Sequence, residues 1–461
     1  MAELPAAELA QSIVERALSN GGDFAELYAV RTRGMSTRID ESRIEGVRSG
    51  EEQGAGVRVV KDGTAYFAHV DGLAEADLQR AADEAATALR GERREPQPLQ
   101  ATETAPQEIR VRPEEVPAER KSELLRELDR RGRSLGDEIV QLQISYSEVR
   151  REVAVSNSAG VFATDDRTRV RIGAQAVASR GDTVQSGVET LGGHAGFELL
   201  EEDPGRVAER AGRTALTLLD AVPAPAGSMP VVVGGGFGGV LFHEMTGHGL
   251  EADHIQKGAS VYEGRMGEMV AESHLNAFDD GLLPGEWGTN AIDDEGTPSQ
   301  KTQVIENGRL VAFLHDRRSA ERGGDEPTGN GRRAGFGHLP IPRMTNTYIA
   351  PGEAEPEEII SEVKKGFYAV SFAGGQVEPA SGDFVFGVSE GYLIEDGKVT
   401  HPCRGATLIG NCVDALAAID AVGNDFDMKS GFCGKGGQQV PVGTGQGHVR
   451  LRELTVGGTA V

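Results

Sequence analysis

The chain has little of three things that would point to particular classes of protein. It has only three cysteines, Cys403, Cys412 and Cys433, which are too few for a disulfide framework and suit a reducing compartment. No apolar run approaches the ~20 residues that a membrane-spanning helix needs. Basic residues are scarce, with 47 Lys and Arg against 72 Asp and Glu, which argues against binding to the phosphate backbone of nucleic acid. We therefore expect neither a nucleic-acid nor a membrane partner.

The start of the chain indicates where the protein works. Met1 is followed by Ala-Glu-Leu-Pro-Ala-Ala-Glu, which carries acid where a secretory signal carries base. We expect a soluble, cytoplasmic protein. A length of 461 residues is enough for two or three domains, each with its own core.

Apolar spacing predicts a mixed α+β organisation for the first part of the chain. Residues 6–19 and 73–89 have helical periodicity, and the runs around Lys61-Asp62-Gly63 predict a hairpin. Residues 91–120 are rich in Pro, Glu, Gln and Arg, which predicts an extended connector and a possible subdivision of this region.

Beyond the connector we expect a second sheet and then a catalytic region. A helix is predicted around Leu124–Leu128, and strict alternation at 140–146 and 168–176 predicts antiparallel strands. A helix over 204–219 and a Pro-rich linker precede a short buried strand at 229–233.

The expected fold class is α+β, with two main parts. Residues 1–226 would form an N-terminal region of antiparallel sheets with flanking helices. Residues 227–461 would form a C-terminal catalytic domain that is predominantly β and carries a metal-site helix, because short β-type runs and glycines dominate from Arg309 onward.

The most informative stretch is His-Glu-Met-Thr-Gly-His-Gly-Leu-Glu-Ala-Asp, from His243 to Asp253. Neutral imidazole is a good zinc ligand, and a carboxylate beside the first ligand, here Glu244, can accept a proton from water held at a metal. His243 and His248 are five residues apart, which in a regular helix leaves their side chains ~140° apart. Gly247 and Gly249 flank His248, so we predict a distorted turn that brings the two rings together.

A catalytic zinc site usually needs a third protein ligand. Cys403, Cys412, Cys433, Glu251, Asp253 and the other histidines are candidates. Cys433 is favoured because glycines on both sides free its backbone and Lys435 would stabilise its thiolate.

A competing motif precedes the histidines. Gly234–Gly239 fits Gly-x-Gly-x-x-Gly between a predicted strand and a predicted helix, as in a dinucleotide-binding turn. No clean βαβ unit and no acidic residue closing a second strand follow it. Alternatively, these glycines let the turn pack tightly or let a substrate backbone approach.

Several segments together carry a resemblance to a known family. They are His243–Asp253, Thr328–Arg333, Pro342–Ile349, Ser381–Ile394, Gly405–Asn411 and Cys433–Gln438. With them the chain resembles the TldD branch of the TldD/PmbA (TldE) metallopeptidases, sometimes called modulators of DNA gyrase. The resemblance spans nearly the whole chain and is strongest after residue 229.

The resemblance implies a zinc-dependent peptidase that degrades or trims unfolded peptides. It places the metal on His243, His248 and Cys433, and the general base at Glu244. It also implies a dimer, either of two identical chains or with a TldE/PmbA-like subunit that lacks the metal motif.

Other residues are expected to assist. Glu251 and Asp253 could orient the imidazoles or could be solvated acids. Ser381–Ile394 could offer a strand edge on which an extended peptide adds, and His338, Arg343 and Asn346 could face substrate or stabilise turns. Two further classes stay open beside the peptidase: a non-catalytic peptide-binding scaffold and a nucleotide-dependent oxidoreductase using Gly234–Gly239.

Overall fold

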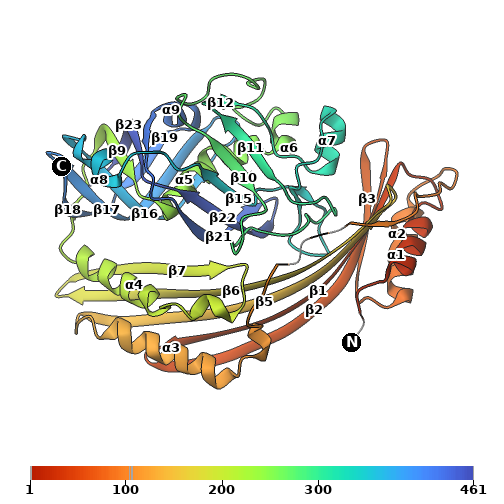
Figure 1. Ribbon diagram of the computed structural model, residues 1–461, viewed down its shortest axis with the longest axis horizontal. Coiled ribbons are helices and arrows are strands. Elements are labelled where there is room, and N and C mark those ends of the chain that lie inside the picture. The colour runs from red at the N-terminus through yellow and green to blue at the C-terminus, as the bar shows by residue number, and fades with distance from the viewer. Residues whose placement is uncertain (1–2, 103, 105–106, 460–461) are drawn as a thin grey trace.

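One long, curved sheet forms the base of the molecule (Figure 1). The computed structural model describes residues 3–102, 104 and 107–459. Seven strands form the sheet in the order β3-β2-β1-β5-β6-β4, with β7 paired to β6. Their bounds are β1 (Phe24–Asp40), β2 (Arg43–Lys61), β3 (Thr64–Asp71), β4 (Gln100–Ala101), β5 (Ile139–Asn157), β6 (Val161–Arg180) and β7 (Thr183–Gly193).

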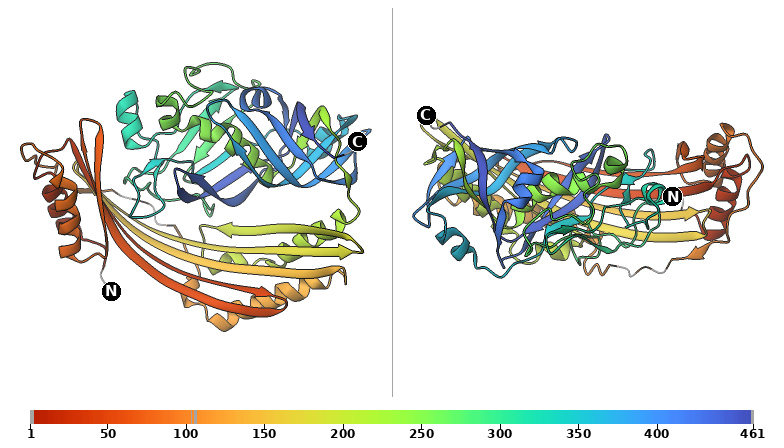
Figure 2. Two further views of the ribbon diagram at one scale, coloured as in Figure 1. Left: turned by 180° about the vertical axis from the view of Figure 1, so that it is seen from behind. Right: turned by 90° about the horizontal axis from the view of Figure 1, so that it is seen from above.

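Four helices cover this sheet at its two ends. α1 (Ala7–Ala17) and α2 (Glu75–Thr87) pack on β1 to β3 through an apolar cluster of their own. α3 (Ala118–Arg133) and α4 (Gly205–Leu218) pack on β5 to β7. Figure 2 shows the two helix pairs at opposite ends of the sheet. The helices and the hairpin expected from periodicity are confirmed.

The expectation of a second N-terminal sheet is wrong. β5 pairs with β1 in an antiparallel register that runs from Glu26↔Asn157 to Ile39↔Ile144, so the strands before and after the connector share one sheet. Among its described residues the connector contains β4, the 3₁₀ turn η1 (Pro113–Glu115) and the first residues of α3, and residues 103, 105 and 106 lie outside the description. An extended connector marks a break in local pattern but does not choose a strand's partner.

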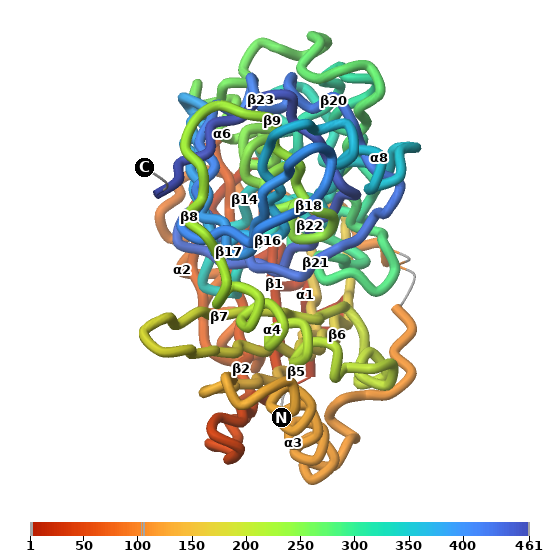
Figure 3. The backbone as a smooth tube through the Cα atoms, turned by 90° about the vertical axis from the view of Figure 1, so that its left-hand side faces the viewer, coloured from red at the N-terminus to blue at the C-terminus, as the bar shows by residue number. Residues whose placement is uncertain are grey.

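The C-terminal half is mainly β and lies over the concave face of this sheet (Figure 1). Figure 3 shows the same arrangement from one end, with the C-terminal half above β7 and β6 and with α3 below them. β16, β9, β23, β19 and β17 pair in a closed ring, since β16 also pairs with β17, and β18, β8 and β20 extend this sheet. The bounds are β8 (Val222–Pro223), β9 (Gly227–Val233), β16 (Lys365–Val377), β17 (Asp383–Glu395), β18 (Lys398–Arg404), β19 (Thr407–Asn411), β20 (Ile419–Val422) and β23 (Val449–Gly457).

A second C-terminal sheet carries the strand that reaches the histidines. Its order is β12-β11-β10-β15-β22-β21, with β21 last. The bounds are β10 (Ala277–Asp280), β11 (Lys301–Glu306), β12 (Arg309–Leu310), β15 (Asn346–Ile349), β21 (Asp427–Lys435) and β22 (Gln438–Gln446), and a separate pair is β13 (Gly331–Arg332) with β14 (Ile341–Pro342).

Short helices complete this half. They are α5 (Gly239–Phe242), α6 (Ala252–Gln256), α7 (Arg317–Gly323), α8 (Pro356–Ser361) and α9 (Cys412–Ala417), while the 3₁₀ turn η2 (Phe197–Leu200) precedes α4 in the N-terminal half. None of the helices in the described part of the chain combines the length and the apolar character of a membrane span. The α+β class and the mainly β C-terminal half are as expected, while the division at residues 226 and 227 stays a prediction.

One expected peptide-binding edge is absent. The segment Ser381–Ile394 lies largely in β17, which pairs with β16 on one side and with β18 and β19 on the other. Because both sides are hydrogen-bonded, this strand cannot accept a further strand, and the expectation for 381–394 is wrong.

Candidate metal centre

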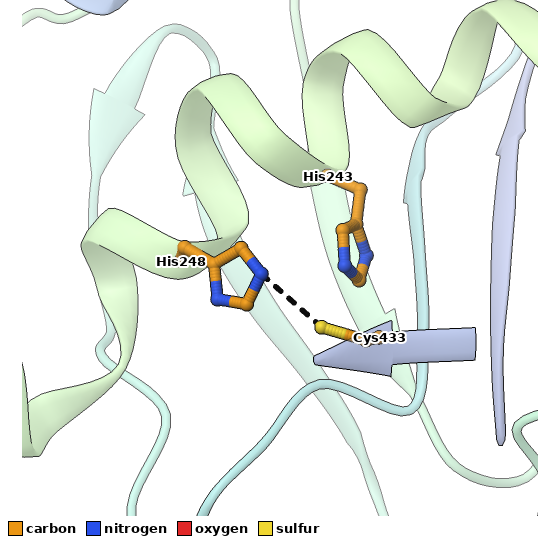
Figure 4. A group of neighbouring side chains, drawn as sticks. All are labelled: His243, His248 and Cys433. Carbon is orange, nitrogen blue, oxygen red and sulfur yellow. Dashed lines mark hydrogen bonds between the residues drawn. The ribbon is translucent and has the colours of Figure 1, made fainter. Parts of the chain in front are cut away.

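The histidine pair lies on a helix that is not regular. After α5 the chain makes a π-helical turn, η4 (His243–Gly247), and then a 3₁₀ turn, η5 (His248–Leu250). The N–H of His248 donates to the C=O of His243, and this bond over five residues makes one wide turn. Both imidazoles consequently project from the same side of the helix (Figure 4). The distorted turn predicted from the spacing is confirmed.

The two glycines serve this turn through close packing. Neither Gly247 nor Gly249 has a positive φ. A Cβ on Gly247 would overlap the sulfur of Met344, and a Cβ on Gly249 would lie 2.7 Å from the ring of Tyr262. The absence of side chains therefore lets the turn lie directly against its neighbours.

Cys433 reaches the histidines from the neighbouring strand β21. Its Sγ lies 3.1 Å from Nε2 of His248 (Figure 4). One nitrogen of each imidazole and this sulfur all lie within 4.8 Å of one another, and all three residues are buried. Among residues 3–102, 104 and 107–459, no other set of three His, Cys, Asp or Glu residues comes close enough to hold a metal ion.

The donor set fits a zinc ion. Neither ring nitrogen of His243 has a hydrogen-bond partner among the described residues, although His243 is buried. A buried polar atom without a partner is costly unless a ligand satisfies it. Two imidazole nitrogens and a thiolate sulfur are ligands that zinc accepts, and three protein ligands leave a fourth position for water or substrate.

The thiol of Cys433 is prepared for metal binding by its neighbours. Burial alone would raise its pKa, but His243 and His248 beside it lower the pKa to about 5. A lowered pKa favours the thiolate, which is the form that binds metals. Lys435 does not have the expected role toward this thiolate, because its ammonium contacts Asp253 at 2.5 Å and Glu251 at 3.1 Å.

Glu251 lies behind His248 and orients it. One carboxylate oxygen of Glu251 lies 2.9 Å from Nδ1 of His248, so Nε2 is the nitrogen that faces Cys433. Burial opposes ionisation of Glu251, but His248 and Lys435 lower its pKa to about 2. Nε of Arg343 lies 3.9 Å from the other oxygen of this carboxylate. Asp253, by contrast, contacts only Lys435 and Lys257 by ion pairs and does not reach an imidazole.

The side chain of Glu244 lies beside the cluster. Its carboxylate is 3.8 Å from Nε2 of His248, and the side chain is 24% exposed. A proton acceptor needs to be close to the reacting groups and to keep an ionisable oxygen accessible. Glu244 meets both requirements.

Two roles were expected for Arg343 and Asn346: contact with substrate or stabilisation of the local fold. The structure supports the second role for both residues. Arg343 is fully buried and donates to the C=O of Cys433 at 2.5 Å and of Gln438 at 3.2 Å. Asn346 is also fully buried and accepts a hydrogen bond from the N–H of Gly288 at 2.9 Å. Both residues hold strands in place around the centre, whereas His338 is exposed.

The other cysteines and the glycine-rich turn have structural roles. Cys403 and Cys412 are buried among apolar residues, and burial raises their thiol pKa to about 11 and about 12. In Gly234–Gly239, a Cβ on Gly239 would lie 2.5 Å from the N–H nitrogen of Gly445 in β22. These glycines allow tight packing, the alternative to a nucleotide-binding turn.

Comparisons with known proteins agree with this architecture. A Haemophilus influenzae protein named metalloprotease TldD homolog is 38% identical over 449 residues, which cover 95% of this chain and 93% of the relative. A Saccharolobus solfataricus protein named zinc metalloprotease TldD homolog is 33% identical over 307 residues, which cover 64% and 68%. The crystal structure of TldE from Thermococcus kodakarensis shares the fold, with a TM-score of 0.78, 20% identity and coverage of 98% and 100%.

Family models extend the agreement over most of the sequence. The models of the PmbA/TldA metallopeptidase domain 1, central domain and C-terminal domain match residues 25–89, 111–219 and 226–458. The third range contains the two histidines and Cys433. The chain belongs to the TldD branch of the PmbA/TldD metallopeptidase family.

Proposed function

We propose that this chain is a zinc-dependent peptidase that hydrolyses unfolded or short peptides. The observation that carries the proposal is the convergence of His243, His248 and Cys433 within 4.8 Å, with the carboxylate of Glu244 beside them. Membership of a metallopeptidase family supports the reaction. The name of the Saccharolobus solfataricus relative supports zinc as the metal.

In this proposal each residue of the centre has one task. Zinc held by His243, His248 and Cys433 supplies Lewis acidity, which polarises a peptide carbonyl and lowers the pKa of a water molecule. The carboxylate of Glu244 accepts the proton of the attacking water and returns it to the leaving amine nitrogen. Because a thiolate ligand donates charge and weakens that acidity, proton transfer by Glu244 carries more of the catalysis.

We further propose that substrate binds as an extended chain on β21. This strand is the last in its sheet order, so the N–H and C=O groups of alternate residues face no partner strand. Main-chain pairing of this kind requires an unfolded substrate, because a folded protein does not offer a free strand. Since Cys433 lies on β21, a peptide on this edge would pass beside the metal centre.

The family relationship also supports a dimer, either of two copies of this chain or with a TldE/PmbA-like subunit. The Thermococcus kodakarensis TldE chain has the same fold, which supports the pairing of two chains of this shape. Sedimentation of the chain alone and mixed with a TldE-like protein would distinguish the two forms.

The variant Glu244→Gln tests the reaction. We expect it to keep about one zinc per chain while hydrolysis of an unstructured peptide falls by about 10²–10⁴-fold. Metal content and peptide cleavage are the two measurements, and Glu263→Gln, at an exposed acid on a loop nearby, is the matched control.

Retained turnover in Glu244→Gln would refute the role of this residue. A zinc-loaded wild-type protein that binds peptides without cleaving them would instead support a scaffold. Nicotinamide or flavin absorbance in the purified protein would support the oxidoreductase.

A further inference from the structure

A second polar cluster lies where β21 meets the N-terminal sheet. The guanidinium carbon of Arg171, on β6, lies 5.9 Å from the ring centre of Phe432. The indole of Trp287 packs against the same ring, with 5.6 Å between the ring centres and 88° between the planes. A Cβ on Gly192 of β7 would lie 2.8 Å from Oγ of Ser430 and 3.0 Å from Cγ of Arg171. We call Arg171, Trp287, Ser430 and Phe432 the Arg171 cluster.

Three members of this cluster carry buried polar atoms without a partner. Nε of Arg171, Nε1 of Trp287 and Oγ of Ser430 make no hydrogen bond to any described residue. Trp287 and Ser430 are only 4% and 9% exposed. The guanidinium and the indole can only donate, and the hydroxyl can donate as well. An unpaired buried donor costs free energy, and an acceptor bound at the cluster would remove that cost.

The charge of Arg171 is also without a partner. Its ring contact with Phe432 is its sole polar or electrostatic side-chain interaction in the described part of the chain. Burial lowers the pKa of Arg171, and no neighbouring acid opposes this effect. The acids Glu189, on β7, and Asp427, on β21, pair with Lys429 and not with Arg171, and each lies 3.5 Å from the Lys429 ammonium.

Arg167, on the same strand, is an arginine whose charge is paired within the protein. Arg167, four residues earlier and on the same face of β6, lies 2.8 Å from Asp165 and 2.7 Å from Asp294. Arg169, between Arg167 and Arg171, has no ion pair but donates to the C=O groups of Trp287 and Thr289 and to the amide oxygen of Asn290. Among the described residues, Arg171 has neither an acid nor a hydrogen-bond acceptor, which leaves a place for an anionic acceptor.

The cluster is placed on the far side of the strand that carries Cys433. Successive side chains along a strand point to opposite faces. Cys433 faces the imidazoles, so Phe432 and Ser430 face the N-terminal sheet and Arg171. A peptide paired with the open edge of β21 would send alternate side chains to these two faces.

We propose that the Arg171 cluster binds a carboxylate of the peptide substrate. The carboxylate is either the C-terminal group of the peptide or an acidic side chain adjacent to the residue that faces the metal centre. A guanidinium offers parallel N–H groups that match a carboxylate, and the indole N–H and serine hydroxyl add further donors. The proposal rests on the proposed function and adds to it a substrate class, namely peptides with a carboxylate at this position.

The single tryptophan of the chain allows binding to be read at the cluster itself, because Trp287 belongs to it. The Glu244→Gln protein, loaded with zinc, is titrated with three peptides while Trp287 fluorescence is followed. They are acetylated tetra-alanine with a free C-terminal carboxylate, the same peptide as an amide, and an amidated peptide in which one alanine is glutamate. We expect at least one carboxylate peptide to bind about tenfold more tightly than the neutral amide.

The two carboxylate peptides distinguish the sources of the charge. Preference for the first identifies the C-terminal group, and preference for the third identifies an acidic side chain. Arg171→Gln should abolish the preference, Arg171→Lys should keep part of it, and Arg48→Gln, at an exposed arginine of β2, should leave it unchanged. Equal affinity for all three peptides, or a preference that survives Arg171→Gln, would overturn the proposal.

Kinetics of the active protein separate this proposal from the proposed function. Arg171→Gln should lower kcat/KM for the preferred carboxylate peptide more than for the amide. If wild-type zinc-loaded protein cleaves acidic and neutral peptides equally well, the carboxylate site is refuted while the peptidase stands. If it cleaves no peptide, the peptidase fails, and the fluorescence titration still decides whether the carboxylate site exists.

Discussion

Two buried polar regions of this molecule differ in how completely they are paired. Where the C-terminal half meets the N-terminal sheet, Arg58 lies 2.8 Å from Glu26 and 2.6 Å from Glu295. Arg333 lies 2.5 Å from the other oxygen of Glu26. At the metal centre, by contrast, the buried imidazole of His243 finds no hydrogen-bond partner for either nitrogen in the described part of the chain. Ion pairs between buried charges, as around Glu26, identify a contact that holds the protein together, and a buried ring with no partner on either nitrogen identifies a place for a ligand.

The strongest test of this comparison removes an unpaired group from the metal centre. We expect His243→Ala to lose its zinc and its peptide hydrolysis while its resistance to urea in the metal-free state is little changed, because the imidazole makes no internal hydrogen bond. Metal analysis, cleavage assays and urea denaturation measure the three effects. His274→Ala, at an exposed histidine, is the control. A variant that still holds about one zinc per chain would contradict the ligand assignment.

Removing a paired group should lower the stability of the protein and leave its zinc binding unchanged. We expect Arg58→Ala to lower the free energy of unfolding by about 3–5 kcal/mol, because it leaves Glu26 and Glu295 buried with less positive charge. The zinc content of the folded protein should stay near one per chain. Arg48→Ala, on an exposed part of the same strand, should change stability little. Loss of zinc without loss of stability would contradict the stabilising role assigned to Arg58.

Replacing Glu251, which has features of both regions, should have the smallest of the three effects. Glu251 is a fully buried, paired carboxylate, but its partner His248 belongs to the metal centre. We expect Glu251→Gln to weaken zinc affinity by about 10–100-fold, since the amide can still accept a hydrogen bond from Nδ1 but carries no charge. Competition with a chelator at fixed pH measures the affinity, and Glu263→Gln serves as the control. Unchanged affinity would mean that Glu251 is only a packing residue.

Local pattern predicted the elements of the fold well and their pairing less well. The helices around Leu9–Leu18 and Leu124–Leu128 and the hairpin at Lys61–Gly63 follow from periodicity and turn residues, which act within a few positions. The single N-terminal sheet and the burial of Ser381–Ile394 between two partners did not follow from local pattern. Partner choice depends on residues far apart in the chain, and alternation of side chains says nothing about it.

The candidate centre could be predicted in part for the same reason. The spacing of His243 and His248 and the flanking glycines indicated a distorted turn, because helix geometry is local. The role expected for Lys435 was wrong, and of the two roles left open for Arg343 the structure supports the stabilising one. In both cases the acids and carbonyls that the cation contacts come from other elements.

By itself the sequence determined the helical and strand segments, the unusual turn between the two histidines and the family to which the chain belongs. Tertiary structure alone decided that Cys433 lies beside a histidine 185 positions away. It also decided that, within the described residues, β21 is last in its sheet and Arg171 has no counter-charge of the kind that Arg167 has. The physical reason is that contacts, burial and charge pairing arise between distant segments only when the sheets and helices pack against one another.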